Sequence, residues 1–244
     1  MKLTPVDVNL SDFPPQFYSV LSKASVYDSS CSEQARVLFI DADGGYFLKK
    51  SAKGSLKNEA VMTKYFHKKG LSAEVLRYFS DEFDWLMTRK IYGNDCVAEK
   101  YMTRPEHLCD KMAELLRNLH SVDFEDCPIN RNETFLQFAA KYAKTEEDLR
   151  NIKVARSLLK TEALLHGDFC LPNIILNDWQ FSGFIDLDCA GFGDIHHDIY
   201  WATRTLKYNL KTDKYRQRFY NAYGRDKINL EIIDIIGKIE ATVD

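Results

Sequence analysis

The sequence predicts an α+β protein, in which a small antiparallel β-sheet with one helix precedes a mainly helical part. Four short apolar runs have the composition of strands and occupy residues 36–41, 46–50, 74–79 and 84–90. Apolar stripes with helical spacing follow residue 103 and are interrupted by a predicted β-hairpin within residues 165–188. A chain of 244 residues suits one domain of two lobes or two small domains. We expect lobes at residues 1–90 and 91–244.

The composition is that of an ordinary globular protein. Hydrophobic residues make up 45% of the chain and charged residues 28%, and the net charge of −3 lacks the concentrated basic character of nucleic-acid binders. The six cysteines are scattered, which favours reduced thiols over a disulfide framework. Residues 1–10 lack the apolar segment of a signal peptide, and no apolar run approaches the roughly 18 residues of a membrane span. We therefore expect a cytoplasmic protein with neither a nucleic-acid nor a membrane partner.

The first lobe begins with a lead-in, residues 1–24, in which three prolines exclude a long helix. The first two apolar runs are joined by Ala42-Asp43-Gly44-Gly45, a strong hairpin signal. A helix is expected from Ser55 to Lys68 and should end at Gly70. The last two apolar runs then complete a small antiparallel sheet.

The second lobe is predicted to be helical on both sides of the hairpin. Thr103-Arg104-Pro105-Glu106 reads as a capping box with proline in the first turn, followed by a leucine stripe that ends near His120. Asp194 is expected to cap a later helix. The further helices are expected at residues 135–142, 149–159, 195–207, 213–223 and 229–241.

One stretch of the second lobe, Leu165–Asp188, is predicted to carry the chemistry. It reads as strand, loop, strand, tight turn at Asn177-Asp178, and strand. Asp168 and Asn173 precede the hairpin and Asp186 follows its returning strand, so we expect their side chains to converge. Carboxylate and amide oxygens are ligands that Mg²⁺ accepts beside phosphates. We therefore expect Asn173 and Asp186 to bind Mg²⁺, and Asp168 to orient a hydroxyl group and take its proton.

The spacing D-x-x-x-x-N, followed by a later metal-binding Asp, is typical of kinase active sites. His166-Gly167-Asp168 stands where protein kinases have H-R-D, and the D-F-G and A-P-E signatures are also missing. A protein kinase is therefore a weaker hypothesis than a small-molecule kinase. The alternative for the whole stretch is an ordinary hairpin in which Asp and Asn only form turns, and we accept it for Asn177 and Asp178.

Lys49 is the candidate for holding the nucleotide phosphates. It lies on the second predicted strand, and the helix that follows contains Glu59. Kinases use such a Lys–Glu pair to hold the α- and β-phosphates. Lys50 competes for the role, but on a strand it points to the opposite face. A solvated lysine at a strand end is the alternative.

The stretch HGDFCLPNIILNDWQFSGFIDLDCAGFGDIHHDIYWATR resembles the aminoglycoside O-phosphotransferases, particularly the 3′-type kanamycin and neomycin kinases. Choline and methylthioribose kinases are more distant relatives. The resemblance extends to Tyr46–Lys49, Trp85–Gly93 and His120–Asn130, and spans most of residues 25–225. It implies a bilobal, protein-kinase-like fold, ATP or GTP as phosphoryl donor with Mg²⁺, an aminoglycoside as acceptor, and a role in antibiotic resistance.

The resemblance also implies where the nucleotide base binds. Thr88 would precede the hinge between the lobes, and Lys90 and Ile91 would offer backbone hydrogen bonds to the base. Phe47 and Ile185 would lie on either side of the ring. Core or edge positions are the alternative for these residues.

Two supporting parts of the site follow from the same resemblance. Ser32 would belong to a glycine-poor loop over the phosphates, with a plain polar turn as the alternative. Asp198, together with His166, would support the catalytic loop rather than take part in the chemistry.

Two segments depart from the resemblance. Aminoglycoside kinases have a longer acid-bearing helical insertion where this chain has only Arg131–Glu162, with Glu146-Glu147-Asp148 as its acidic cluster. Residues 237–244 lack the acidic-aromatic ending of the family. Two alternatives therefore stay open: a kinase of another hydroxylated metabolite (a sugar or an amino alcohol), and a nucleotide-binding pseudokinase module.

Overall fold

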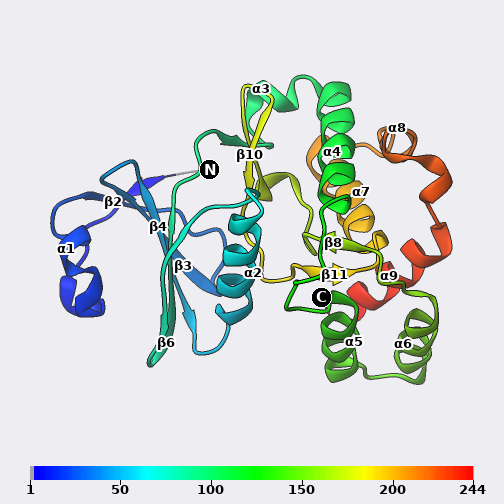
Figure 1. The fold of residues 1–244 in the computed structure, drawn as a ribbon, viewed down its shortest axis with the longest axis horizontal. Coiled ribbons are helices and arrows are strands. Elements are labelled where there is room, and N and C mark those ends of the chain that lie inside the picture. Colours follow the sequence, from blue (N-terminus) through cyan, green and yellow to red (C-terminus); the bar gives the residue numbers. More distant parts are fainter. Residues whose placement is uncertain (1–2, 244) are drawn as a thin grey trace. The chain divides into compact units, whose positions relative to one another are not determined.

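The structure is a computed structural model that describes residues 3–243, and these residues form two compact units (Figure 1). The first unit comprises the described residues up to Asn94 together with Ile175–Asp178 and Ser182–Asp188. The second unit comprises the remaining described residues. The first unit contains a sheet and one long helix, and the second is mainly helical, so the predicted α+β class is confirmed. The lobe boundary after residue 90 stays a prediction.

The first unit is built on a six-stranded antiparallel sheet of order β1-β2-β3-β4-β6-β5. Its strands are β1 (Thr4–Pro5), β2 (Ser25–Asp28), β3 (Ala35–Asp41), β4 (Tyr46–Ala52), β5 (Val75–Ser80) and β6 (Phe83–Arg89). The four predicted strands are confirmed, whereas β1 and β2 were not predicted. β1 contains a proline and only two residues, and β2 contains four, so neither produces the alternating apolar pattern that predicts a strand.

The lead-in contains no long helix, as predicted, and packs against the sheet. It forms two 3₁₀ turns, Leu10–Asp12 and Pro15–Phe17, and the short helix α1 (Tyr18–Leu21). Phe13 and Phe17 are buried, and each ring centroid lies 5.8 Å from that of Trp85 on β6. These aromatic residues belong to an apolar core that the lead-in forms with the sheet.

Helix α2 (Lys57–Lys68) is tied to the sheet at its start by the buried carboxylate of Asp84. The Leu56 amide donates to Asp84 Oδ2 at 2.9 Å, and the hydroxyls of Tyr78 and Ser80 donate at 3.1 Å and 2.5 Å. Burial alone would raise the pKa of Asp84, but these hydrogen bonds hold it below its ordinary value. Asp84 therefore fixes the helix that carries Glu59.

We predict that Asp84→Asn lowers the free energy of unfolding by about 2 kcal/mol at pH 7, because the amide turns one acceptor oxygen into a donor facing other donors. The folded-state pKa of Asp84 lies below its unfolded value. Its stabilisation is therefore present above the unfolded pKa and is lost as the pH falls through the folded pKa. Urea denaturation at pH 7 and below pH 4 measures both effects. The exposed Glu82→Gln is the control, and an equal loss in both variants would contradict the prediction.

The second unit contains seven α-helices among its described residues. They are α3 (Glu99–Met102), α4 (Pro105–His120), α5 (Arg131–Tyr142), α6 (Glu146–Leu158), α7 (His196–Leu210), α8 (Arg216–Tyr223) and α9 (Leu230–Val243). In Figure 1, α5 and α6 lie side by side, and both contact α9 around an apolar core that includes Phe135 and Ile236. None of the helices formed by the described residues is long and apolar enough to cross a bilayer.

The helix starts correct two details of the sequence prediction. Pro105 does open α4, but Arg104 is the N-cap and makes no side-chain cap bond, so the predicted capping box is wrong. Thr103 is instead the C-cap of α3, so the end of that helix stands where Thr103 was expected to cap α4. At α7 the N-cap is Ile195, although the Asp194 carboxylate one residue earlier still accepts the His196 N–H at 2.9 Å.

The predicted β-hairpin consists of β9 (Ile174–Asn177) and β10 (Gln180–Phe184), which form a sheet of order β10-β9-β7 with β7 (Asn94–Asp95). Its two-residue turn is Asp178-Trp179, with φ values of 46° and 66°, one residue later than predicted. The entry strand β8 (Ala163–Leu165) does not join this hairpin and instead pairs antiparallel with β11 (Gly191–Gly193).

Candidate active site

The second unit contributes the loop that carries Asp168 and Asn173. The loop follows β8, and Asn173 ends the 3₁₀ turn Leu171–Asn173 directly before β9. The Asn173 side-chain amide donates to Asp168 Oδ2 at 2.9 Å and to the Asp168 carbonyl at 3.1 Å. The Cys170 thiol donates to Asp168 Oδ1 at 3.0 Å. Both oxygens of the candidate catalytic carboxylate are therefore held, and the two predicted residues do lie together.

These bonds also determine which atom of Asn173 can bind a cation. Its amide nitrogen is directed to Asp168, so the amide oxygen Oδ1 is the group left to act as a ligand. The donor set of Asn173 and a carboxylate suits the oxygen preference of Mg²⁺. The contact of Cys170 with Asp168 was not predicted from the sequence, because no spacing pattern links this cysteine to the loop chemistry.

Asp198, in the first turn of α7, holds the start of the loop. Its Oδ2 accepts the His166 amide at 2.8 Å and its Oδ1 accepts the Gly167 amide at 2.7 Å. Burial would raise the pKa of Asp198, but the hydrogen bonds from His120 and from the amide of His166 hold it below its ordinary value. The side chains of His166 and Asp198 are both fully buried. The buried Asp198 carboxylate therefore bonds the backbone at the start of the loop, and the supporting role of His166 and Asp198 stays a prediction.

Gly167 is required by the shape of this loop. Its φ is +81°, and a Cβ atom built there would lie 1.8 Å from the Cys189 carbonyl oxygen. Because the obstacle is backbone, no side-chain rotation can remove the clash. The loop can adopt this path only with glycine before Asp168.

We predict that Gly167→Ala lowers the free energy of unfolding by more than about 2 kcal/mol and displaces the loop. Gly70→Ala is the matched control, because Gly70 has a φ of +73° but has no atom within 4 Å of an added Cβ. Gly70→Ala should lower the free energy of unfolding by about 1 kcal/mol, because only the positive φ is unfavourable there. Urea denaturation of both variants measures the difference, and equal losses would contradict a steric role for the Cys189 carbonyl.

The first unit contains an ion-pair cluster of Lys49, Glu59 and Asp186. Lys49 Nζ lies 2.7 Å from Glu59 Oε2 and 3.0 Å from Asp186 Oδ1. Burial would lower the pKa of Lys49, but the two carboxylates raise it above its ordinary value. Burial raises the pKa of Glu59 to about 7, against the opposing effect of Lys49. Lys49 is therefore a fixed positive charge between a buried and a more exposed carboxylate.

Asp186 has an unusual backbone for a non-glycine residue. Its φ is 60°, in the left-handed region, and its side chain is 49% exposed. Such conformations are costly and concentrate at functional sites. A carboxylate that spends one oxygen on Lys49 retains another acceptor for a cation. The sequence identified Asp186 by its spacing, but no local signal predicted its backbone.

The residues proposed to contact the base lie on β4, β6 and the segments that follow β6 and β10. Phe47 and Thr88 are direct neighbours across β4 and β6, and Ile185 is half-buried immediately before Asp186. The Lys90 N–H already donates to the Gly45 carbonyl at 3.0 Å, so its carbonyl is the backbone group left for a ligand. The contact of Lys90 with the base stays a prediction, now limited to this carbonyl.

Ile91 and Ser32 are the other two residues that were predicted to contact the nucleotide. The Ile91 side chain packs on Gly183 of β10, since a Cβ there would lie 2.7 Å from Ile91 Cδ1. Ser32 is exposed in the loop between β2 and β3. In that loop Ser30, not Ser32, is bonded, since its hydroxyl oxygen accepts the Val37 amide at 2.9 Å.

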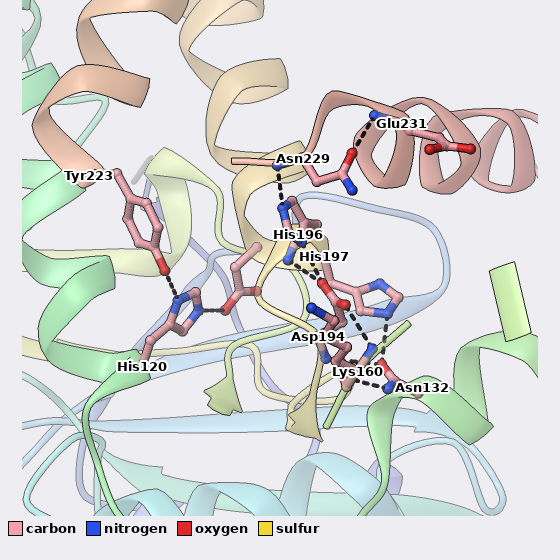
Figure 2. A network of polar contacts seen from close by, with 10 residues as sticks. His120, Asn132, Lys160, Asp194, His196, His197, Tyr223, Asn229 and Glu231 are labelled. Carbon is pink, nitrogen blue, oxygen red and sulfur yellow. Dashed lines mark hydrogen bonds and ion pairs between the residues drawn. The ribbon is translucent and has the colours of Figure 1, made fainter. Parts of the chain in front are cut away.

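A second polar cluster in the second unit, formed by Glu162, Asp194 and His196, has metal-ligand chemistry but is fully bonded at its histidine. His196 Nδ1 lies 2.6 Å from Asp194 Oδ1, and His196 Nε2 accepts the Asn229 amide at 2.9 Å (Figure 2). Both ring nitrogens are therefore occupied. The cluster joins α7 to the start of α9 and offers no histidine lone pair to a cation.

A family model and curated proteins match the sequence of this chain. Residues 28–231 match the phosphotransferase enzyme family. A probable aminoglycoside 3′-phosphotransferase from Lactococcus lactis subsp. lactis is 43% identical over 256 residues, which cover 98% of this chain and 98% of that protein. An aminoglycoside 3′-phosphotransferase from Niallia circulans is 31% identical over 164 residues, 60% of this chain and 62% of that protein.

Solved structures support the same conclusion for the fold. A crystal structure of an aminoglycoside-3′-phosphotransferase of type VIII has a TM-score of 0.72 and 21% identity, and the match covers 98% of this chain and 93% of that one. A choline kinase from Streptococcus pneumoniae has a TM-score of 0.66 and 17% identity, covering 93% and 85%. The predicted kinase-like fold is thereby confirmed. Because the family match spans most of the chain and the Lactococcus relative nearly all of it, this chain belongs to the phosphotransferase enzyme family.

Proposed function

We propose that the enzyme transfers the γ-phosphoryl group of ATP or GTP to a hydroxyl group of an aminoglycoside, at the 3′ position. The relative at 43% identity over nearly the full chain bears that activity in its name. The observation that carries the chemistry is the Asp168 carboxylate, whose two oxygens are held by Cys170 and Asn173. A carboxylate fixed in this way can orient an attacking hydroxyl group and accept its proton.

The other residues serve the nucleotide. Lys49, kept protonated by Glu59 and Asp186, would bind phosphate oxygens. Asn173 Oδ1 and the Asp186 carboxylate would hold Mg²⁺, which neutralises the charge on the phosphates when bound. Phe47, Thr88, Ile91 and Ile185, with the Lys90 carbonyl and the loop of Ser32, would form the nucleotide pocket.

The acidic cluster on α6 is less available to a cationic acceptor than its composition suggests. The Asp148 carboxylate accepts the amides of Lys144 and Thr145 at 2.9 Å and 2.8 Å, and its other oxygen accepts the Thr242 hydroxyl at 3.1 Å. It therefore caps α6 and links it to α9. Only Glu146 and Glu147 of the cluster are then left to bind a cationic acceptor. Another hydroxylated metabolite is therefore kept as the second candidate acceptor.

The test is a panel of acceptors assayed by coupled ADP release with ATP and with GTP, using kanamycin, neomycin, streptomycin, choline and methylthioribose. We expect kanamycin and neomycin to be phosphorylated at the 3′-hydroxyl, located by NMR of the product. Inert aminoglycosides with turnover of choline or methylthioribose would overturn the aminoglycoside assignment. Tight Mg²⁺–nucleotide binding with no acceptor turned over would favour the pseudokinase module.

We further propose that the enzyme acts in the cytoplasm. A kinase needs a supply of nucleoside triphosphate and Mg²⁺, and both are plentiful there. Fractionation of cells that produce the protein tests this, and activity confined to an extracellular fraction would contradict it.

A further inference from the structure

A chain of side-chain hydrogen bonds connects the ends of α4 and α8 to the carboxylate beneath the catalytic loop. His120 is the last residue of α4, and its Nε2 lies 3.1 Å from Asp198 Oδ2. Its other ring nitrogen, Nδ1, lies 2.8 Å from the hydroxyl of Tyr223, the last residue of α8 (Figure 2). The side chains of His120 and Asp198 are 5% and 0% exposed, so water does not compete strongly for these bonds.

The protons in this chain can be assigned from its chemistry. An ionised Asp198 can only accept, so His120 Nε2 carries a hydrogen. In a neutral imidazole the other nitrogen, Nδ1, is then an acceptor, so the Tyr223 hydroxyl group, whose pKa burial raises, donates to it. Each member therefore donates toward Asp198, which also accepts the amides of His166 and Gly167. The orientation of this carboxylate sets the backbone directly before Asp168.

The rings are also held by packing. The Tyr223 ring meets the His120 ring edge-on, with centroids 5.8 Å apart, and stacks on Phe219 of α8 at 6.3 Å with an interplanar angle of 14°. Removal of the Tyr223 hydroxyl group alone therefore leaves an aromatic ring in the same place. The hydrogen bond and the packing can be separated experimentally.

We propose that His120 and Tyr223 are positioning residues for the phosphoryl transfer, which act through Asp198 on the loop that presents Asp168. The proposal rests on the proposed role of Asp168 as the residue that orients the acceptor hydroxyl group. It assigns a catalytic consequence to two residues that contact neither Asp168 nor Asn173 by any bond described here.

Four variants test it in the full-length enzyme. Tyr223→Phe removes only the hydroxyl group, His120→Leu removes both ring nitrogens, and His120→Gln restores a donor near the Nε2 position. Tyr220→Phe is the matched control, because Tyr220 lies on the same helix, is equally buried, and hydrogen-bonds Thr203 instead. Two readouts are used: kcat and KM for nucleotide and acceptor, and amide hydrogen exchange at His166 and Gly167 measured by NMR.

We expect Tyr223→Phe and His120→Leu to lower kcat by about 10- to 100-fold with KM values changed less than about 3-fold. Exchange at the His166 and Gly167 amides should accelerate in both variants. His120→Gln should recover most of the kcat lost in His120→Leu, and Tyr220→Phe should match the parent in both readouts.

The proposal is overturned if Tyr223→Phe keeps the parent kcat and amide exchange, or if His120→Gln is as impaired as His120→Leu. Should His120→Leu fail to fold, Tyr223→Phe alone decides the question. The exchange measurement needs no acceptor substrate, so it tests the link from His120 and Tyr223 to the loop separately from the proposed phosphoryl transfer. Altered exchange with no turnover of any acceptor would reject the proposed function and retain the link to the loop, whereas unchanged exchange in an active enzyme would reject the link alone.

Discussion

Asp168→Asn should lower kcat by about 10²- to 10⁴-fold while the affinity for nucleotide changes little. An asparagine amide cannot accept the proton of the attacking hydroxyl group, yet it is close in size to the carboxylate. Its oxygen can still accept a bond from Asn173 or Cys170, so the loop is retained at the cost of one mismatched bond. Pre-steady-state measurement of the transfer step would separate loss of chemistry from loss of binding.

Asp178→Asn is the control for this substitution. Asp178 is exposed at the turn of the hairpin that follows Asp168, with a φ of 46° that asparagine tolerates well. We expect it to retain the parent rate. A rate for Asp168→Asn within a few-fold of the parent would remove Asp168 from the chemistry and leave it a structural role in the loop.

Asp186→Ala should abolish turnover and weaken Mg²⁺-dependent nucleotide binding. The substitution removes the proposed ligand for the cation and one of the two carboxylates beside Lys49. Its effect should depend on the metal, so titration of Mg²⁺ and of Mn²⁺ against bound nucleotide measures it directly. Nucleotide binding that is unchanged in affinity and in metal dependence would contradict the assignment of Asp186 as a metal ligand.

Backbone strain must be separated from lost ligation in this experiment. Asp186 has a φ of 60°, which alanine tolerates poorly and asparagine tolerates well. Asp186→Asn therefore keeps the backbone and one ligand oxygen while removing the charge. We expect it to retain measurable nucleotide binding and to lose most of kcat, with thermal unfolding close to that of the parent.

The parts of the site that lie within short stretches of sequence could be predicted. Asp168 and Asn173 are five residues apart in one loop, so their spacing reports their contact directly. Lys49 and Glu59 were predicted because strand parity and helix position both restrict where their side chains point. By contrast, β2 was missed because four residues carry too little pattern, and Thr103 was misread because a short helix ends there.

The parts that depend on distant residues could not be predicted. Asp84 meets the start of α2 across 28 residues, and His120 meets Asp198 and Tyr223 across 78 and 103 residues. No periodicity in one sequence links such positions, since their pairing arises only when the helices pack. The packing of the lead-in was not predicted for a similar reason, because Phe13 and Phe17 acquire their role only on contact with Trp85.

The thiol beside Asp168 has a consequence for the chemical durability of the enzyme. Burial, together with the adjacent Asp168 charge, raises the pKa of Cys170 well above its ordinary value. The sulfur atom next to the Asp168 carboxylate therefore stays uncharged at neutral pH, and a neutral thiol is a poor nucleophile toward peroxides and alkylating compounds. Oxidative conditions that inactivate enzymes with an ionised cysteine should leave this centre intact.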